Sequence, residues 1–347
     1  MDYSKSNSQP FQMSIFTHPD INPSGYSQGL ELFTCIPWFE MSKNNLNVSG
    51  TADPARLRQE RSAMIYNTRV KLIVFAAPLE NCHRFPGVRE EIILDALLKI
   101  AGSGHNGSMT NNSASVSFSL KEIFKTVKSL NGNKAKYDLG AIKESLLVLN
   151  GARYELQVFD ESGDSTMYRD SLLSGLGVSS RREWLSGNHS DSPCYARFHP
   201  LVFIAIEALR IRPYRLDVTM QFSSPYARRM HKYLSMYYKQ CSTAHPYNIS
   251  LSHALEMTTN VNSDSKSTLS KKARPFESAL IELGEQDVLA DWSYTSSYEK
   301  GKTGRDKEMD RIYKLVPHAS FVKSVRKSNA LQNIIRDKQD IATVNQA

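Results

Sequence analysis

The sequence predicts an α+β fold, with two tandem winged-helix domains behind a flexible N-terminal arm. The chain has 347 residues, which at roughly 100–200 residues per domain is enough for about two domains. Its 40% hydrophobic content excludes a wholly disordered chain. One order of elements, three helices followed by a β-hairpin, is predicted twice. We place the arm at residues 1–60, the domains at 61–212 and 213–322, and a basic C-terminal tail at 323–347.

The predicted arm has two parts. Residues 1–28 are rich in Ser, Asn, Gln, Pro and Gly, a composition typical of a flexible segment. Residues 30–48 contain an apolar cluster in which Pro37 argues against a continuous helix. This cluster either docks on the body as a strand or contacts a partner. Docking is favoured, because a large aromatic side chain such as Trp38 is usually buried.

The first predicted domain combines helical periodicity with β-rich segments. Ser119 precedes an apolar helical pattern, and Glu122 three residues later completes the sequence of a capping box. The segments after Gly151 are rich in β-branched and aromatic residues. The expected elements are, in order, a strand at 69–77, a helix at 92–100, a helix from 120, a helix at 137–149, a hairpin with its turn at 161–164, a strand at 195–200 and a helix at 201–211.

The second predicted domain repeats this order. Ser224 caps a helix that Pro225 opens, and the tyrosines of that helix fall on one apolar face, which indicates core packing rather than base stacking. Ser250 begins a short second helix. The expected elements are helices at 223–240, 250–258 and 267–286, followed by a hairpin at 287–318.

The charge is unevenly distributed between the two halves of the chain. The net charge is +8, from 43 basic and 35 acidic residues. Residues 1–199 hold 21 basic and 20 acidic residues, whereas residues 200–347 hold 22 and 15. Nearly all of the excess therefore lies in the second half, which points to a polyanionic partner for that half.

The predicted third helix of the second domain carries the main functional signal. Its apolar residues share one face, while another face gathers polar and basic side chains. The candidate DNA-contacting residues of this helix are Lys266, Ser267, Ser270, Lys271, Lys272 and Arg274. A recognition helix presents its N-terminal residues to the major groove, so this basic start suits a reader of double-stranded DNA. An ordinary solvated amphipathic helix is the alternative.

Other basic residues support the DNA-binding interpretation. The turn of the second hairpin is basic and glycine-containing, as expected of a wing that reaches a phosphate backbone. Its candidate contacts are Lys300, Lys302 and Arg305. Arg228 and Arg229 of the first helix would brace the backbone. Pro275 should kink the recognition helix or mark its proper start.

No catalytic, metal or cofactor motif is found, so the sequence predicts a non-enzymatic protein that needs no cofactor. A P-loop is excluded because Ser296 stands where the first glycine is required. The four cysteines form no C-x-x-C pair, which argues against a zinc ribbon or a disulfide scaffold. No apolar run approaches the roughly 18 residues of a membrane span. The N-terminus does not read as a secretory signal, so we expect a cytoplasmic protein.

Several strings resemble plasmid replication initiators of the iteron-binding, theta-replicating type. The strings are PYARRMHKYLSMYY, PYNISLSHALEM and KKARPFESALIELGEQDVLADW, and the resemblance covers roughly residues 65–320. It implies two winged-helix domains, binding to direct repeats at an origin, melting of an adjacent AT-rich segment, and recruitment of a host initiator and replicative helicase. It also implies a monomer in equilibrium with a homodimer formed through the first domain, as in plasmid copy control. The recognition role is carried over only to residues 266–274.

Two other functions remain open on the residues alone. A winged-helix transcriptional repressor or a partition-type DNA-binding regulator would use the same elements. Whether the first domain also contacts DNA is likewise open. A nicking or primase-like enzyme is disfavoured, because the sequence has no His-x-His or Asp-x-Asp pair.

Overall fold

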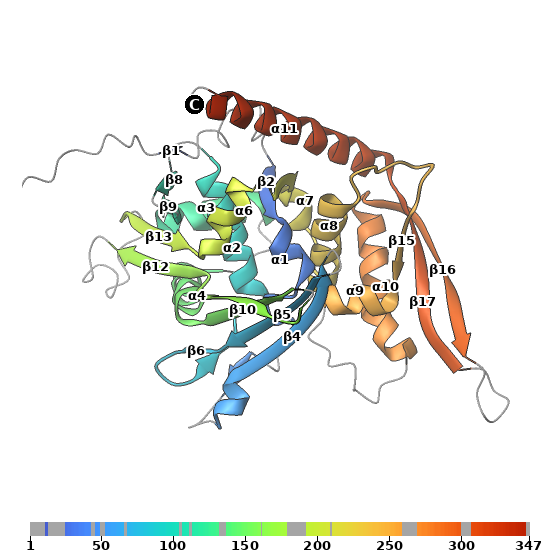
Figure 1. Cartoon of the computed structure of the whole chain (residues 1–347), viewed down its shortest axis with the longest axis horizontal. Helices are drawn as coiled ribbons and strands as arrows, with labels where there is room; N and C mark the ends of the chain where they lie inside the picture. Colours follow the sequence, from blue (N-terminus) through green and yellow to red (C-terminus); the bar gives the residue numbers. More distant parts are fainter. Residues whose placement is uncertain are drawn as a thin grey trace, which may run out of the picture.

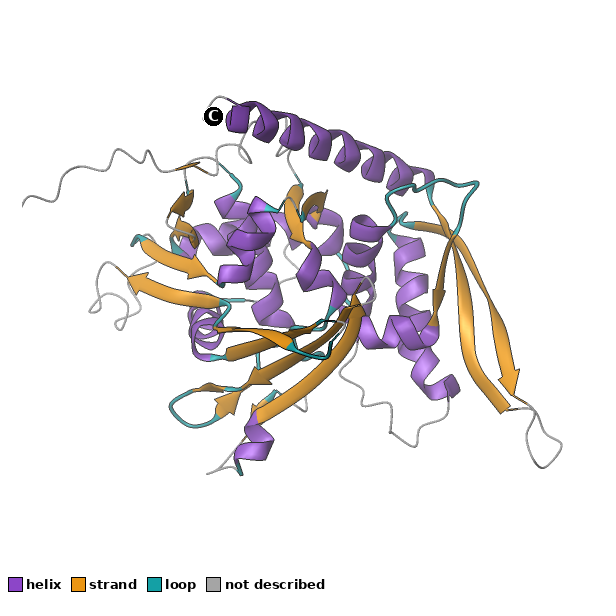
Figure 2. Ribbon diagram, viewed as in Figure 1, coloured by secondary structure: helices purple, strands orange, loops and turns teal. Residues whose placement is uncertain are grey.

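A computed structural model describes most of the chain. The described residues are 11–12, 25–42, 46–48, 53–65, 68–103, 106–110, 113–131, 137–160, 162–178, 192–208, 210–258, 269–299 and 307–344. Helices and strands are mixed throughout, which confirms the predicted α+β class (Figures 1 and 2). Buried apolar side chains form two clusters, one from Leu30 to Met220 and one from Phe222 to Val325. We call these the first and the second core.

The first core is built from helices and two larger antiparallel sheets. Its helices are α1 (Glu31–Cys35), α2 (Val88–Ala101), α3 (Leu120–Asn131), α4 (Leu139–Gly151), α6 (Pro200–Glu207) and α7 (Leu216–Thr219). One sheet has the order β11 (Ser165–Asp170), β10 (Arg153–Phe159), β5 (Thr68–Phe75), β4 (Arg58–Ile65). The other has the order β1 (Phe11–Gln12), β8 (Gly107–Thr110), β9 (Ser113–Phe118), β13 (Cys194–Phe198), β12 (Leu173–Val178).

Short elements complete this part of the chain. A small sheet joins β3 (Asn47–Val48), β7 (His83–Arg84) and β6 (Ala77–Pro78), and a 3-10 turn covers Pro54–Leu57. The Ser119 hydroxyl accepts a hydrogen bond from the Glu122 backbone N–H at 3.1 Å, so the predicted cap of α3 is present. The helix predicted at 201–211 ends at Glu207. The backbone then turns into a strand that pairs with the N-terminal segment.

The N-terminal apolar segment is part of the first core. Strand β2 (Tyr26–Leu30) pairs with β14 (Ile211–Arg215), and α1 follows directly. Trp38 is 0% exposed, and its ring lies 4.8 Å from that of Phe33. The segment docks on the body as predicted, but it does so through helix α1 and the residues after it rather than as a strand. The boundary predicted at residue 60 differs from the structure, because β2 and α1 already bury their side chains in the first core and residue 60 lies inside β4.

The second core has the predicted three helices and hairpin in the predicted order, with one strand, β15, that was not predicted. These are α8 (Pro225–Tyr237), β15 (Tyr247–Ser250), α9 (Leu251–Thr258), α10 (Leu269–Glu285), β16 (Leu289–Glu299) and β17 (Lys307–Pro317). The strands form one antiparallel sheet in the order β15-β17-β16. Ser224 caps α8 by accepting a hydrogen bond from the Ala227 N–H, as the sequence predicted. Figure 1 shows the β16–β17 hairpin projecting away from the body, alongside and beyond α10.

The C-terminal segment is a helix rather than a solvated tail. Helix α11 (Ala319–Val344) buries Phe321, Val322 and Val325 in the second core. Farther along, Asn329 and Gln332 accept hydrogen bonds from the Arg212 guanidinium on β14. The tail predicted at 323–347 is therefore wrong for residues 323–344, which belong to α11, while residues 345–347 lie outside the described residues. Figure 1 shows α11 running along one side of the molecule from the second core across the first.

A group of buried charges joins the two cores. Lys232 on α8 places its ammonium 2.9 Å from a Glu91 carboxylate oxygen and 2.5 Å from an Asp95 carboxylate oxygen, both on α2. Burial alone would raise the pKa of Glu91, but the charges of Lys232, Arg229 and Arg228, together with the hydrogen bond from Lys232, outweigh it and lower that pKa to about 2. Tyr214 donates a further hydrogen bond to Asp95. Two helices from different cores are thus linked by paired charges rather than by apolar contact alone.

Removing the cation of this group should destabilise the fold. Lys232→Met keeps an unbranched side chain but leaves two buried carboxylates unpaired, which costs about 3–5 kcal/mol in the free energy of unfolding. Urea denaturation at pH 7 measures this loss. The loss of stability should be smaller near pH 4 than at pH 7. Without Lys232, burial raises the folded-state pKa of both carboxyl groups, so at pH 4 the folded protein holds them protonated and buries less negative charge.

Lys239→Met is the matched control, since Lys239 is exposed just beyond the end of α8. It should leave the free energy of unfolding nearly unchanged. A Lys232→Met protein as stable as the native protein would contradict the assigned role of this group.

Candidate nucleic-acid interface

Helix α10 rests on the second core through one face. Ala273, Phe276, Ala279, Leu280 and Leu283 are buried on that face. The predicted apolar pattern is confirmed, and the helix is continuous across Pro275, which is exposed. A proline here removes one backbone hydrogen bond from the helix without ending it. Of the two predicted effects of Pro275, a kink or a helix start, the helix start is wrong, since α10 begins six residues earlier at Leu269.

The opposite face of α10 carries an exposed stripe. Its members are spaced three and four residues apart, so they lie above one another on one side of the helix. They are Lys271, Arg274, Ser278, Ile281 and Glu285. Basic charge lies at the N-terminal end, neutral side chains in the middle and an acid at the far end. This order places cationic groups where a recognition helix meets DNA phosphates.

The β16–β17 hairpin holds one side of α10 through Arg311. The Arg311 guanidinium is buried and donates to the carboxylates of Glu277 on α10, at 2.8 Å, and of Glu308 on β17, at 2.9 Å. It also donates to the Ser270 hydroxyl at 3.2 Å and lies over the Tyr294 ring, 4.7 Å from its centroid. Hydrogen bonding to Glu308 raises the pKa of Arg311 and lowers that of Glu308.

A second aromatic side chain completes this contact. The Tyr313 hydroxyl donates a 2.7 Å hydrogen bond to the same Glu277 oxygen that accepts from Arg311. Burial, followed by the hydrogen bond to Glu277, raises the pKa of Tyr313. The hairpin and the N-terminal half of α10 are thus joined by charge-assisted hydrogen bonds, which are stronger and more directional than neutral ones.

The start of α8 holds the other side of α10. Glu282 accepts hydrogen bonds from the Ser223 hydroxyl at 2.8 Å and from the Ser224 N–H at 3.0 Å. A carboxylate at a helix N-terminus is also favoured by the helix dipole. Contacts on both flanks therefore leave the stripe between them as the free surface of α10.

The predicted site residues of α10 differ in exposure and in their contacts. Lys271 and Arg274 are exposed on the stripe. Ser270 faces the hairpin and accepts from Arg311, while Lys272 is half-buried. The remaining predicted contacts, in the segments before α10 and between β16 and β17, lie outside the described residues; they are Lys266, Ser267, Lys300, Lys302 and Arg305.

Neither of the two predicted arginines of α8 is fully exposed. Arg229 is 1% exposed and donates to the backbone oxygen of Ile36 at 3.2 Å. Burial lowers its pKa, although Glu91 and Asp95 act in the opposite direction. The prediction that Arg229 contacts DNA is wrong, because its guanidinium points into the junction of the two cores. Arg228 is half-buried and donates from Nε to the Phe222 carbonyl oxygen at 3.0 Å.

Four side chains of this site were not predicted from the sequence. Ser278 and Ile281 continue the spacing of Lys271 and Arg274, so extending that pattern by two steps would have found them. Arg311 alternates with Tyr313 along β17, and this period of two places both side chains on the face toward α10.

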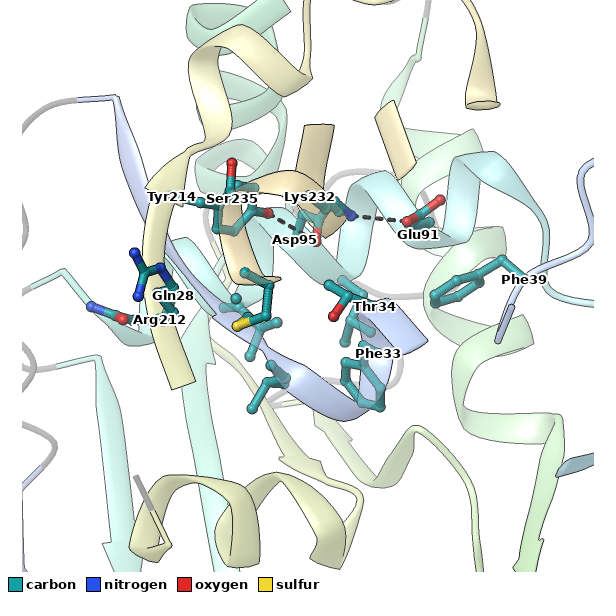
Figure 3. A pocket seen from close by; sticks show the side chains of 15 residues that line it. Gln28, Phe33, Thr34, Phe39, Glu91, Asp95, Arg212, Tyr214, Lys232 and Ser235 are labelled. Atoms are coloured by element: carbon teal, nitrogen blue, oxygen red, sulfur yellow. Dashed lines mark hydrogen bonds and ion pairs between the residues drawn. The ribbon is translucent and has the colours of Figure 1, made fainter. Parts of the chain in front are cut away.

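A small cavity lies at the junction of the cores. β2, α1, α2, β14 and α8 surround it, and its volume is about 20 Å³ (Figure 3). Lys232, Thr34 and Gln28 line it among other residues. That volume holds about one water molecule and no organic cofactor.

The described residues form neither a metal-binding cluster nor a membrane-spanning helix. Within them, no group of three or more His, Cys, Asp or Glu side chains is placed to hold a metal ion. None of the described helices combines the length and the apolar character needed to cross a bilayer. The exposed stripe of α10 and the adjoining hairpin are therefore the strongest candidate site.

The fold resembles that of domains 2 and 3 of RctB. The alignment with the crystal structure of those domains covers 83% of this chain and 98% of the RctB chain, with a TM-score of 0.50 and 12% sequence identity. No protein-family model matches the sequence, and no curated protein matches it significantly. At this identity the likeness to RctB shows the fold alone.

Loosening the Arg311 contact should free the hairpin from α10. Arg311→Lys keeps the positive charge but loses the planar fork that reaches two carboxylates at once. We expect faster hydrogen–deuterium exchange in β16 and β17, with a global stability loss of only about 1–3 kcal/mol. Lys314→Ala, an exposed position on the opposite face of β17, is the control and should leave exchange unchanged. Equal exchange in the native and Arg311→Lys proteins would show that this contact does not position the hairpin.

Proposed function

We propose that this protein is a DNA-binding replication initiator, in which the second unit is a winged helix that reads double-stranded DNA. The exposed stripe of α10 carries the proposal, because it sets Lys271 and Arg274 at the free N-terminal end of the third helix. The β16–β17 hairpin is the wing. Its position beside α10 allows helix and wing to contact neighbouring parts of one duplex.

The fold and the sequence resemblance support the initiator role. The chain shares its fold with domains 2 and 3 of RctB. The resembling strings of this chain point to plasmid initiators that bind direct repeats. We propose that the protein binds such repeats at a plasmid origin, assists melting of the adjacent AT-rich DNA and recruits a host initiator and replicative helicase. The first unit would form a homodimer in equilibrium with the monomer.

Footprinting on the DNA that flanks the protein's own gene tests this role. We expect protection of several direct repeats next to an AT-rich tract. Protection of a single palindromic operator, with no repeats, would instead support a transcriptional repressor or a partition-type regulator. Absence of any protected sequence would contradict specific DNA binding altogether.

The exposed cations of α10 should account for part of the salt dependence of binding. Each phosphate contact contributes about 0.9 to the slope of log affinity against log salt concentration. The double variant Lys271→Ala/Arg274→Ala should therefore bind its selected duplex at least about tenfold more weakly, with a slope smaller by about one to two. Fluorescence anisotropy titrations over a range of salt concentrations measure both quantities.

The matched control is Lys323→Ala/Arg326→Ala, which removes the same two kinds of charge from exposed positions on α11. It should change affinity and slope much less than the α10 variant. Equal losses in the two double variants would mean that general charge, rather than this helix, directs binding.

A further inference from the structure

Ile281 is an exposed apolar side chain on the exposed stripe of α10. It is 55% exposed, although the helix that carries it buries five residues in the second core. Ile281 stands seven residues after Arg274, which is close to two helical turns, so both lie on the same side of α10. It is therefore part of the surface that the basic residues bring to DNA.

The neighbours of Ile281 do not cover it. Glu282 turns to Ser223 and Ser224 at the start of α8. Glu277, on the other flank, turns to Arg311 and Tyr313. Both flanks are occupied by contacts within the chain, while Ile281 remains exposed between them. An apolar side chain in this place gains nothing from water and can gain from an apolar partner.

The major groove of DNA offers one apolar group at the edge of a base. That group is the C5-methyl of thymine, whereas the other bases present hydrogen-bond donors and acceptors there. At about 1.5 Å rise per residue, Ile281 lies about 10 Å along the helix from Arg274, within reach of the same groove. We infer that Ile281 determines specificity by packing against a thymine methyl group. This inference rests on the proposed DNA-binding function of α10.

The order of side chains along the stripe supports this assignment. Lys271 and Arg274 suit phosphates or a guanine edge, and Ser278 can hydrogen-bond to any base. Glu285, one turn beyond Ile281, would be repelled by phosphates. Ile281 therefore lies over the base edges, at the end of the contact between α10 and DNA. A thymine methyl group suits this apolar side chain better than a charged group does.

Thymine-to-deoxyuridine substitution tests the inference, because it removes the methyl group alone. The full-length protein first selects its preferred duplex from a random-sequence library, and each thymine of that duplex is then replaced in turn. We expect one replacement to weaken native binding about fourfold, the value of burying one methyl group. Ile281→Ala should bind the unmodified duplex several times more weakly and should be insensitive to that same replacement.

The control variant is Ile204→Ala, which makes the same change at an exposed position of α6 in the first core. It should retain native affinity and native sensitivity to deoxyuridine. If the native protein selects a sequence but Ile281→Ala keeps the full deoxyuridine effect, the contact with thymine is wrong while DNA binding stands. If native binding responds to no replacement, the inference is likewise overturned. If the native protein selects no sequence, the proposed function itself fails.

Discussion

The guanidinium of Arg311 joins the β16–β17 hairpin to α10, and the proposed interface depends on the angle between these two elements. One planar group satisfies Glu277 on the helix and Glu308 on the hairpin, and its face lies against Tyr294. A rigid fork that is bonded at both ends resists rotation, because any hinge motion breaks a charge-assisted hydrogen bond. The hairpin strands are each 11 residues long and project past the helix, so a small change of angle at Arg311 would become a large displacement at the tip.

The two cores are joined by a different kind of contact. Lys232 pairs with Glu91 and Asp95, while Arg212 bonds to side chains of α11. Buried ion pairs add little net stability, since the cost of removing charges from water is comparable to their attraction. They do penalise every arrangement that leaves a charge unpaired. The junction therefore favours one relative placement of the two units, which an apolar interface of the same size would specify less strictly.

Local signals allowed much of the second unit to be predicted. Ser224 and Pro225 mark the start of α8, and the spacing of Phe276 and Leu280 identifies the buried face of α10. These features depend on neighbours within a few residues. By contrast, Arg229 and Lys271 occupy similar basic helical segments, yet only Lys271 is exposed. The burial of Arg229 depends on the Ile36 carbonyl, 193 positions earlier in the chain, which no local pattern reveals.

The role of the last helix also depends on distant partners. Phe321 and Val325 enter the second core, while Asn329 and Gln332 bind Arg212 beside the first. During synthesis, nearly all of both units therefore leaves the ribosome before α11, the helix that packs on the second core and binds Arg212 beside the first. Until then, the apolar site for Phe321 stays open and Arg212 lacks these two partners. The contacts that α11 makes with both units can therefore form only after those units have been synthesised.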